Sequence, residues 1–132
     1  MPDAAPASIT LAIVPQVVDV LPGELVVEHD GDPGVRVDAA GIVAIVRAPD
    51  GTTIIRAAVD ADVERWVALW TGGTAHGLDA PGMTASIAAP LSAAGLALFV
   101  IGTATADLVL VAAGQRDLAL ETLAGAGHTI AD

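Results

Sequence analysis

The sequence contains no cysteine, no lysine and no tyrosine, and aromatic residues make up only 2% of its 132 residues. Without cysteine the chain has no disulfides, no thiolate zinc sites and no thiol nucleophiles. Without lysine, its 5 basic residues are all arginines; they face 16 aspartates and glutamates, for a net charge of −11. Nucleic-acid phosphates and anionic lipid surfaces are bound by clustered basic residues. We therefore expect no nucleic acid and no membrane among the partners.

Hydrophobic residues make up 54% of the chain, which excludes intrinsic disorder and allows a folded core of mainly small and β-branched side chains. Residues 80–106 carry no charge, yet their prolines, glycines and hydroxyl side chains favour a short helix and a buried strand over a membrane span. The first ten residues lack the pattern of a secretory signal, which favours a cytoplasmic location.

The residue types needed for catalysis or metal binding do not gather along the chain. His29, His76 and His128 are far apart in sequence, and no nucleophile has a visible base beside it. Both kinds of site need side chains that converge. We therefore predict no enzyme activity, no metal site and no cofactor.

The first half is divided by turn residues into short apolar segments. We expect a strand at residues 9–14, a hairpin of residues 17–20 and 24–28 around Leu21-Pro22-Gly23, and a hairpin of residues 42–47 and 52–56 around Pro49-Asp50-Gly51.

The second half predicts strands at residues 66–70, 96–101, 107–111 and 128–130 and helices at residues 82–94 and 115–126. Met83, Ile87 and Leu91 recur at helical spacing, Pro90 is expected to kink that helix, and Gly95 is a natural stop. In the second helix, an inward stripe of Leu120, Leu123 and Ala124 is expected.

The order of these elements is β-α-β-β-α-β, the ferredoxin-like plan, in which two helices cover one face of an antiparallel sheet. The fold class is therefore α+β. We expect a disordered leader at residues 1–7, a first module at residues 8–63 whose helices are reduced to turns, and a second module at residues 64–132.

Four segments of the second half resemble an ACT domain. They are Gly77-Leu78-Asp79-Ala80-Pro81-Gly82-Met83-Thr84-Ala85-Ser86-Ile87, the stretch from Pro90 to Phe99, the stretch from Ile101 to Val111, and Leu118 to His128. Together they are similar to the small tandem-ACT proteins related to aspartokinase regulatory domains and to cytosolic arginine sensors. The likeness is good from about residue 42 to residue 130.

The resemblance implies an amino-acid-binding regulatory protein whose ligand lies at a module or subunit interface. A helix N-terminus offers unpaired N–H groups to a carboxylate, and a nearby acid can hold the ammonium group. The implied ligand-binding residues are Asp79, Gly82, Met83, Thr84, Gly102, Thr103 and Asp107, with Thr53 and Ile54 of the first module on the opposite wall.

Each acidic candidate also has a structural interpretation. Asp79 suits a turn or helix cap before Pro81, and Asp107 could be an exposed strand end. Gly102 stands where the family commonly has serine, and alanines replace polar or bulkier residues at 104 and 106. The alternative function is therefore a degenerate ACT-like module that serves dimerisation or partner docking without a ligand. In either case open sheet edges favour a homodimer.

Overall fold

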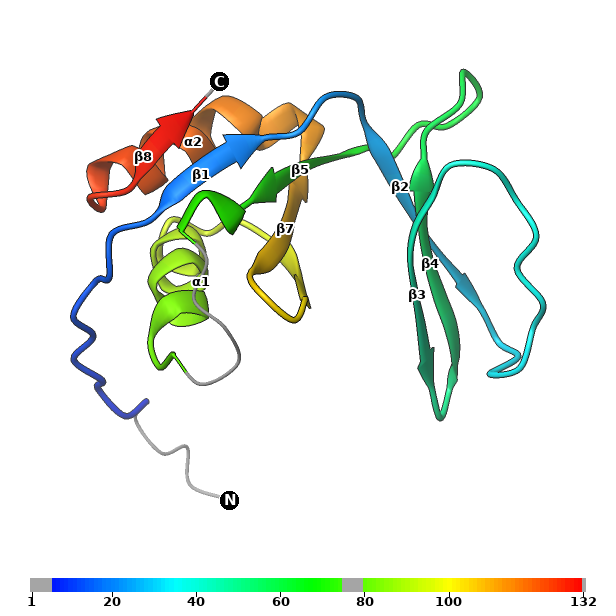
Figure 1. Cartoon of the computed structure of the whole chain (residues 1–132), viewed down its shortest axis with the longest axis horizontal. Coiled ribbons are helices and arrows are strands. Elements are labelled where there is room, and N and C mark those ends of the chain that lie inside the picture. The colour runs from blue at the N-terminus through cyan, green and yellow to red at the C-terminus, as the bar shows by residue number, and fades with distance from the viewer. Residues whose placement is uncertain (1–5, 75–79, 132) are drawn as a thin grey trace.

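The computed structural model describes residues 6–74 and 80–131, which form two α-helices and one curled eight-stranded sheet (Figure 1). The elements are β1 (Val17–Val20), β2 (Leu25–Asp30), β3 (Ile42–Ala48), β4 (Gly51–Ala57), β5 (Trp66–Trp70), α1 (Met83–Ala93), β6 (Leu98–Gly102), β7 (Asp107–Ala112), α2 (Arg116–Gly125) and β8 (Thr129–Ala131). The α+β class is confirmed.

The order β5-α1-β6-β7-α2-β8 is the predicted βαββαβ order. β7 lies between β5 and β6 and is antiparallel to both. The ferredoxin-like plan is modified at one place: β1 lies between β5 and β8, antiparallel to β5 and parallel to β8. A strand from the first half of the chain is therefore built into the sheet of the second half.

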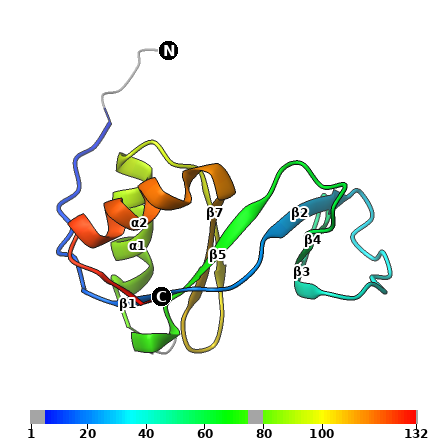
Figure 2. The same cartoon turned by 90° about the horizontal axis from the view of Figure 1, so that it is seen from above.

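The helices cover one face of the central strands β5 and β7, and β2, β3 and β4 curl over so that they face the other side (Figure 2). On the helix side, alternate residues of β5 and β7 pack with α1 and α2. This core consists of Val18, Val67, Leu69, Ile87, Leu91, Leu96, Val109, Val111, Ala119 and Leu123.

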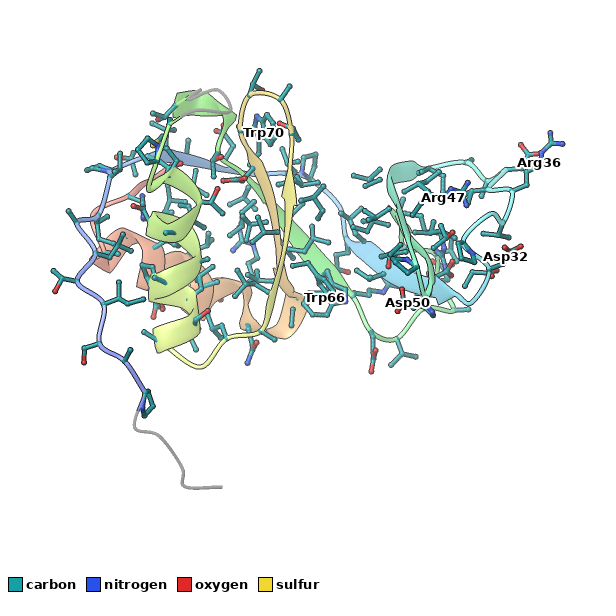
Figure 3. The ribbon with its side chains drawn as sticks, turned by 90° about the horizontal axis from the view of Figure 1, so that it is seen from below. Asp32, Arg36, Arg47, Asp50, Trp66 and Trp70 are labelled. Atoms are coloured by element: carbon teal, nitrogen blue, oxygen red, sulfur yellow. The ribbon has the colours of Figure 1, made fainter. Side chains whose placement is uncertain are left out.

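The opposite face of β5 and β7 packs against β4 and β2. Ala68, Leu108 and Leu110 meet Ile55 of β4 in a second buried cluster, bordered by Trp66 and Trp70 at the two ends of β5 (Figure 3). Trp66 also contacts Phe99 edge to face, with ring centroids 4.9 Å apart. The protein thus has three layers, namely the helices, the central strands, and the strands β2, β4 and β3, in which β4 lies between the other two.

The predicted hairpin of residues 17–20 and 24–28 is wrong. Both strands form, but each pairs with β5 rather than with the other: Val20 lies opposite Leu69, and Leu25 lies opposite Trp66. The backbone N–H of Leu21 donates to the carbonyl of Ala68 at 2.9 Å, so the chain continues along β5 instead of reversing. This path places β1 between two strands and buries Val18 completely.

The predicted strand at residues 9–14 is also wrong, because these residues belong to no strand. Ile9 is 88% exposed, and the segment runs beside α1 (Figure 1). Its end is held by a side chain instead of a ladder, since the N–H of Val14 donates to Ser86 Oγ at 2.9 Å. The apolar pattern is typical of a strand, but β1 and β8 already occupy that side of β5.

The predicted helices are confirmed to within one or two residues. Met83, Ile87 and Leu91 are buried, and α1 ends before Gly95, whose φ is +80°. In α2 the inward residues are Ala119 and Leu123, with Leu120 packed at the side. Ala124 is exposed, contrary to prediction, because the residues four apart at 119 and 123 take the sheet-facing stripe.

The division into modules at residues 63 and 64 stays a prediction, and most of the predicted leader lies outside the described residues. Among the residues described in the range 8–63, the structure contains strands and no helix. Across the described parts of the chain, no helix is long and apolar enough to cross a membrane.

Candidate functional site

In the part of the chain that the structure describes, no side chain caps the start of α1. Its N-cap is Gly82, which has a left-handed φ of 85° and no side chain that could cap the helix. A Cβ placed at Gly82 would have Val14 Cγ2 at 3.7 Å as its nearest neighbour. Glycine is therefore required here by conformation rather than by space. Among the described residues, no side chain accepts from the first-turn N–H groups, which include those of Met83 and Thr84.

Asp107, the first residue of β7, lies beside this turn. Its side chain is only 4% exposed, and the Thr84 hydroxyl donates to Asp107 Oδ2 at 2.8 Å. The interpretation of Asp107 as an exposed strand end is thus wrong. A buried carboxylate costs free energy unless hydrogen bonds compensate its lost hydration, and Thr84 supplies one of them.

The backbone of Asp107 is held by Thr71, which is fully buried. Asp107 N donates to Thr71 Oγ1 at 2.9 Å, and the Thr71 N–H donates to the carbonyl of Asp107 at 3.1 Å. The Thr71 hydroxyl also donates to that carbonyl at 3.3 Å. Thr71 therefore continues the β5–β7 pairing beyond Trp70 and holds the backbone from which the Asp107 side chain extends.

Gly102 and Thr103 approach the site from β6 and its turn. Gly102 pairs with Asp107 across the strands, and a Cβ at Gly102 would lie 4.0 Å from Asp107 Oδ1. Thr103 is exposed, and its hydroxyl donates to the carbonyl of Ala106 at 3.0 Å and accepts the Ala106 N–H at 3.1 Å. Thr103 is therefore engaged in shaping the β6–β7 turn.

A buried polar network lies under the same end of α1. Gln16 donates from Nε2 to the carbonyl of Met83 at 2.8 Å. The Gln16 N–H donates to His128 Nδ1 at 3.1 Å, and His128 Nε2 donates to the carbonyl of Ser86 at 2.7 Å. A ring nitrogen that accepts from a backbone N–H carries no proton, so the His128 ring is neutral in this arrangement. The network joins the start of β1, the start of β8 and α1.

Pro90 explains why the carbonyl of Ser86 can accept from a histidine. In an α-helix this carbonyl would accept the N–H of residue 90, but proline has none. His128 supplies the missing donor from the other side of the core. Pro90 is thus accommodated within α1, which continues to Ala93.

The remaining predicted site residues lie elsewhere. Thr53 and Ile54 are on β4, in the layer on the other side of the central strands. Thr53 lines a hollow of about 200 Å³ together with Val46 and Phe99, and Ile54 lines a different hollow with Arg36. Asp79 lies outside the described residues. The structure therefore brings together Gly82, Met83, Thr84, Gly102 and Asp107, but not the β4 pair.

A separate ion-pair cluster ties β2 and β4 to the following loop. Arg56 donates to Glu28 Oε1 at 2.6 Å and to Asp62 Oδ2 at 3.0 Å. The Arg56 guanidinium, helped by the N–H of Val59, lowers the pKa of Asp62 to about 2. In the described residues, no group of three histidine, cysteine or acidic side chains is placed to hold a metal ion.

Residues 63–125 match the ACT domain family. The match begins just before β5 and ends with α2, so it contains both helices and the whole cluster of Gly82, Thr84 and Asp107. ACT domains are regulatory, non-catalytic domains that bind small molecules. Strands β1–β4 and β8 lie outside the matched segment.

Two solved structures share the fold of nearly the whole chain. A protein of Agobacterium tumefaciens is 24% identical with a TM-score of 0.76, and the alignment covers 89% of this chain and 93% of that one. A Vibrio cholerae protein of unknown function, described as a possible transport protein, is 21% identical with a TM-score of 0.65, covering 85% and 87%. These likenesses concern the fold alone. No curated protein matches.

The sequence did not predict the roles of Gln16, Thr71, Ser86 and His128 around α1 and Asp107. Three of them carry short polar side chains or an amide in apolar surroundings, where a buried polar residue without a partner is costly. That pattern could have marked Gln16, which is the single polar residue between Pro15 and Asp19. Its partners lie 67 and 112 residues away, beyond any local pattern.

Proposed function

We propose that this protein is an ACT-type regulatory protein that binds an amino acid at the start of α1. The ligand carboxylate would accept hydrogen bonds from the first-turn N–H groups of Met83 and Thr84. Its ammonium group would bind the carboxylate of Asp107. The observation that carries the proposal is the buried Asp107 side chain beside an α1 N-terminus that no described side chain caps.

The glycines of the cluster suit a ligand between these groups. Gly82 presents backbone without a side chain at the helix start, and Gly102 leaves space next to Asp107 Oδ1. Thr53 and Ile54 lie on β4, and we propose that they reach the ligand as the opposite wall only from a neighbouring module or a second copy. A cytoplasmic homodimer related to the tandem-ACT amino-acid sensors is the assembly that this proposal favours.

The direct test is a thermal-shift screen against the twenty amino acids at millimolar concentration. A ligand that binds the folded state alone at 100 times its Kd adds about 2.7 kcal/mol to the free energy of unfolding. Asp107→Asn keeps the shape and the acceptor for Thr84 but removes the charge. We expect this substitution to weaken the binding free energy of the best ligand by about 2–5 kcal/mol.

Asp60→Asn is the matched control, because it removes the same charge from an exposed side chain away from the site. Its ligand affinity should equal that of the wild type. The unliganded Asp107→Asn protein should melt at or slightly above the wild-type temperature, since a buried charge has been removed. Equal affinities for all three proteins would contradict the site.

The second candidate function is a ligand-free ACT-like module that serves dimerisation or partner docking. The observation in its favour is that Asp107 is 4% exposed and already accepts a hydrogen bond from Thr84. For this candidate no amino acid shifts the melting temperature, and Asp107→Asn changes stability alone.

A further inference from the structure

A hollow not yet described lies at the opposite end of β7 from Asp107. It is lined by the kink between β1 and β2, by Val67 of β5 and by Arg116, the first residue of α2, and its volume is about 390 Å³. Small-molecule sites commonly measure about 300–1,000 Å³. The six residues of β7 separate this hollow from the α1 site by roughly 20 Å at the usual rise of a strand.

The lining combines an apolar floor with one charge of each sign. Val20, Leu21, Pro22 and Val67 supply the floor, and Arg116 and Glu24 supply the charges. Gly23 has a φ of +82°, and a Cβ placed on it would meet no atom within 4 Å, so the rim is open on that side.

Among the described residues, both charged side chains pair with partners at the surface. Arg116 pairs with its neighbour Asp117 at 3.0 Å, and that carboxylate is 88% exposed. Glu24 pairs with Arg65 at 3.2 Å, with both side chains at least 30% exposed. Exposed pairs of this kind contribute about 0–1 kcal/mol, so a ligand can replace them at small cost.

We propose that this hollow binds a zwitterionic small molecule, of the class of an α-amino acid with an aliphatic side chain. The ligand carboxylate pairs with the Arg116 guanidinium, and the ligand ammonium pairs with Glu24. The aliphatic group lies on Val20 and Val67. This site is independent of the proposed function at α1, since it shares no residue with it.

The test uses L-leucine as the probe and titration calorimetry on the full chain, with valine methyl NMR signals as the local readout. We expect L-leucine to shift the Val20 and Val67 methyl signals. Arg116→Gln and Glu24→Gln should each weaken its binding about tenfold to a hundredfold, the range for a hydrogen bond to a charged group. 4-Methylpentanoate, which lacks the ammonium group, and isopentylamine, which lacks the carboxylate, should bind more weakly than L-leucine.

Arg36→Gln is the charge-matched control, because Arg36 is 88% exposed and lies outside this hollow. It should bind L-leucine like the wild type, and so should Asp107→Asn. L-leucine binding that is lost in Asp107→Asn but kept in Arg116→Gln and Glu24→Gln would overturn this inference and support the α1 site. The absence of any shift at Val20 and Val67 would overturn it as well.

Discussion

The hydroxyl groups of two threonines hold Asp107 in place. Thr71 bonds the backbone of Asp107 at both its N–H and its carbonyl, and Thr84 bonds the carboxylate. The position of Asp107 was predictable from its place at a strand start in an ACT-like pattern. Its two threonine partners were not, because one follows β5 and the other lies in α1, and only the folded chain brings them together.

Asp62 is the residue for which the structure predicts a pH dependence. Its pKa is about 2 when folded, against 3.8 for the free side chain, because Arg56 donates hydrogen bonds to it. Because the pKa of Asp62 is lower in the folded than in the unfolded protein, the ionised carboxylate stabilises the fold at pH values above about 4. This stabilisation is lost as the pH falls from about 4 to 2. Asp62→Asn should therefore lower the free energy of unfolding at neutral pH and converge with the wild type near pH 2.

Urea unfolding over a pH series measures this difference. Asp38→Asn is the control, because Asp38 is 80% exposed and pairs with an equally exposed arginine. Its unfolding curve should follow that of the wild type at each pH. If the free energy of unfolding of Asp62→Asn lies below that of the wild type by the same amount at every pH, the lowered pKa of Asp62 is contradicted.

At the scale of elements, periodicity predicted both helices and the order of the strands around them. The segment Leu21-Pro22-Gly23 was misinterpreted as a hairpin turn. The same residues also suit a kink after which the chain keeps its direction. The choice is made by β5, whose residues Leu69 and Trp66 pair with the chain on each side of the kink. Such a choice depends on a segment about 45 residues further on and has no local signature.

Pro90 and His128 make a testable pair within the elements. His128→Phe keeps the ring but removes both hydrogen bonds, leaving the buried carbonyl of Ser86 without a donor. An unsatisfied buried group costs about 1–3 kcal/mol. In a Pro90→Ala background, the N–H of residue 90 can reach that carbonyl, so His128→Phe should cost about 1 kcal/mol less.

Urea denaturation of the four proteins, wild type, two single variants and the double variant, measures this coupling. The Gln16 N–H loses its acceptor in both His128→Phe proteins, so that loss cancels from the comparison. Strictly additive effects would show that His128 does not replace the missing helix donor.

At the scale of the whole molecule, the two halves of the chain share their cores. β1 lies inside the ACT-like sheet, and Ile55 of β4 is 2% exposed against Ala68, Leu108 and Leu110. The sequence predicted two modules because the first half offers strands like those of the second, with its helices reduced to turns. It could not show that the face of β5 and β7 away from the helices is buried by β2 and β4.

This packing predicts one cooperative unfolding transition. Ile55→Ala should destabilise the protein by about 2–5 kcal/mol and shift the whole transition. Tryptophan fluorescence reports on β5 at the junction, and far-UV circular dichroism reports on the helices. The two probes should give one midpoint in the variant and in the wild type.

Val63→Ala is the matched control, since Val63 is 91% exposed and its truncation should change the midpoint little. Two separated transitions, with only the fluorescence transition moved by Ile55→Ala, would mean that the modules fold independently.

A backbone-amide NMR titration shows whether an amino acid binds at the start of α1. The titrant is the amino acid that stabilises the protein most. We expect saturable shifts that are largest at Met83, Thr84, Gly102 and Asp107, and that are lost in Asp107→Asn. Shifts confined to β4 around Thr53, or no saturable shift with any amino acid, would contradict the proposed site at α1.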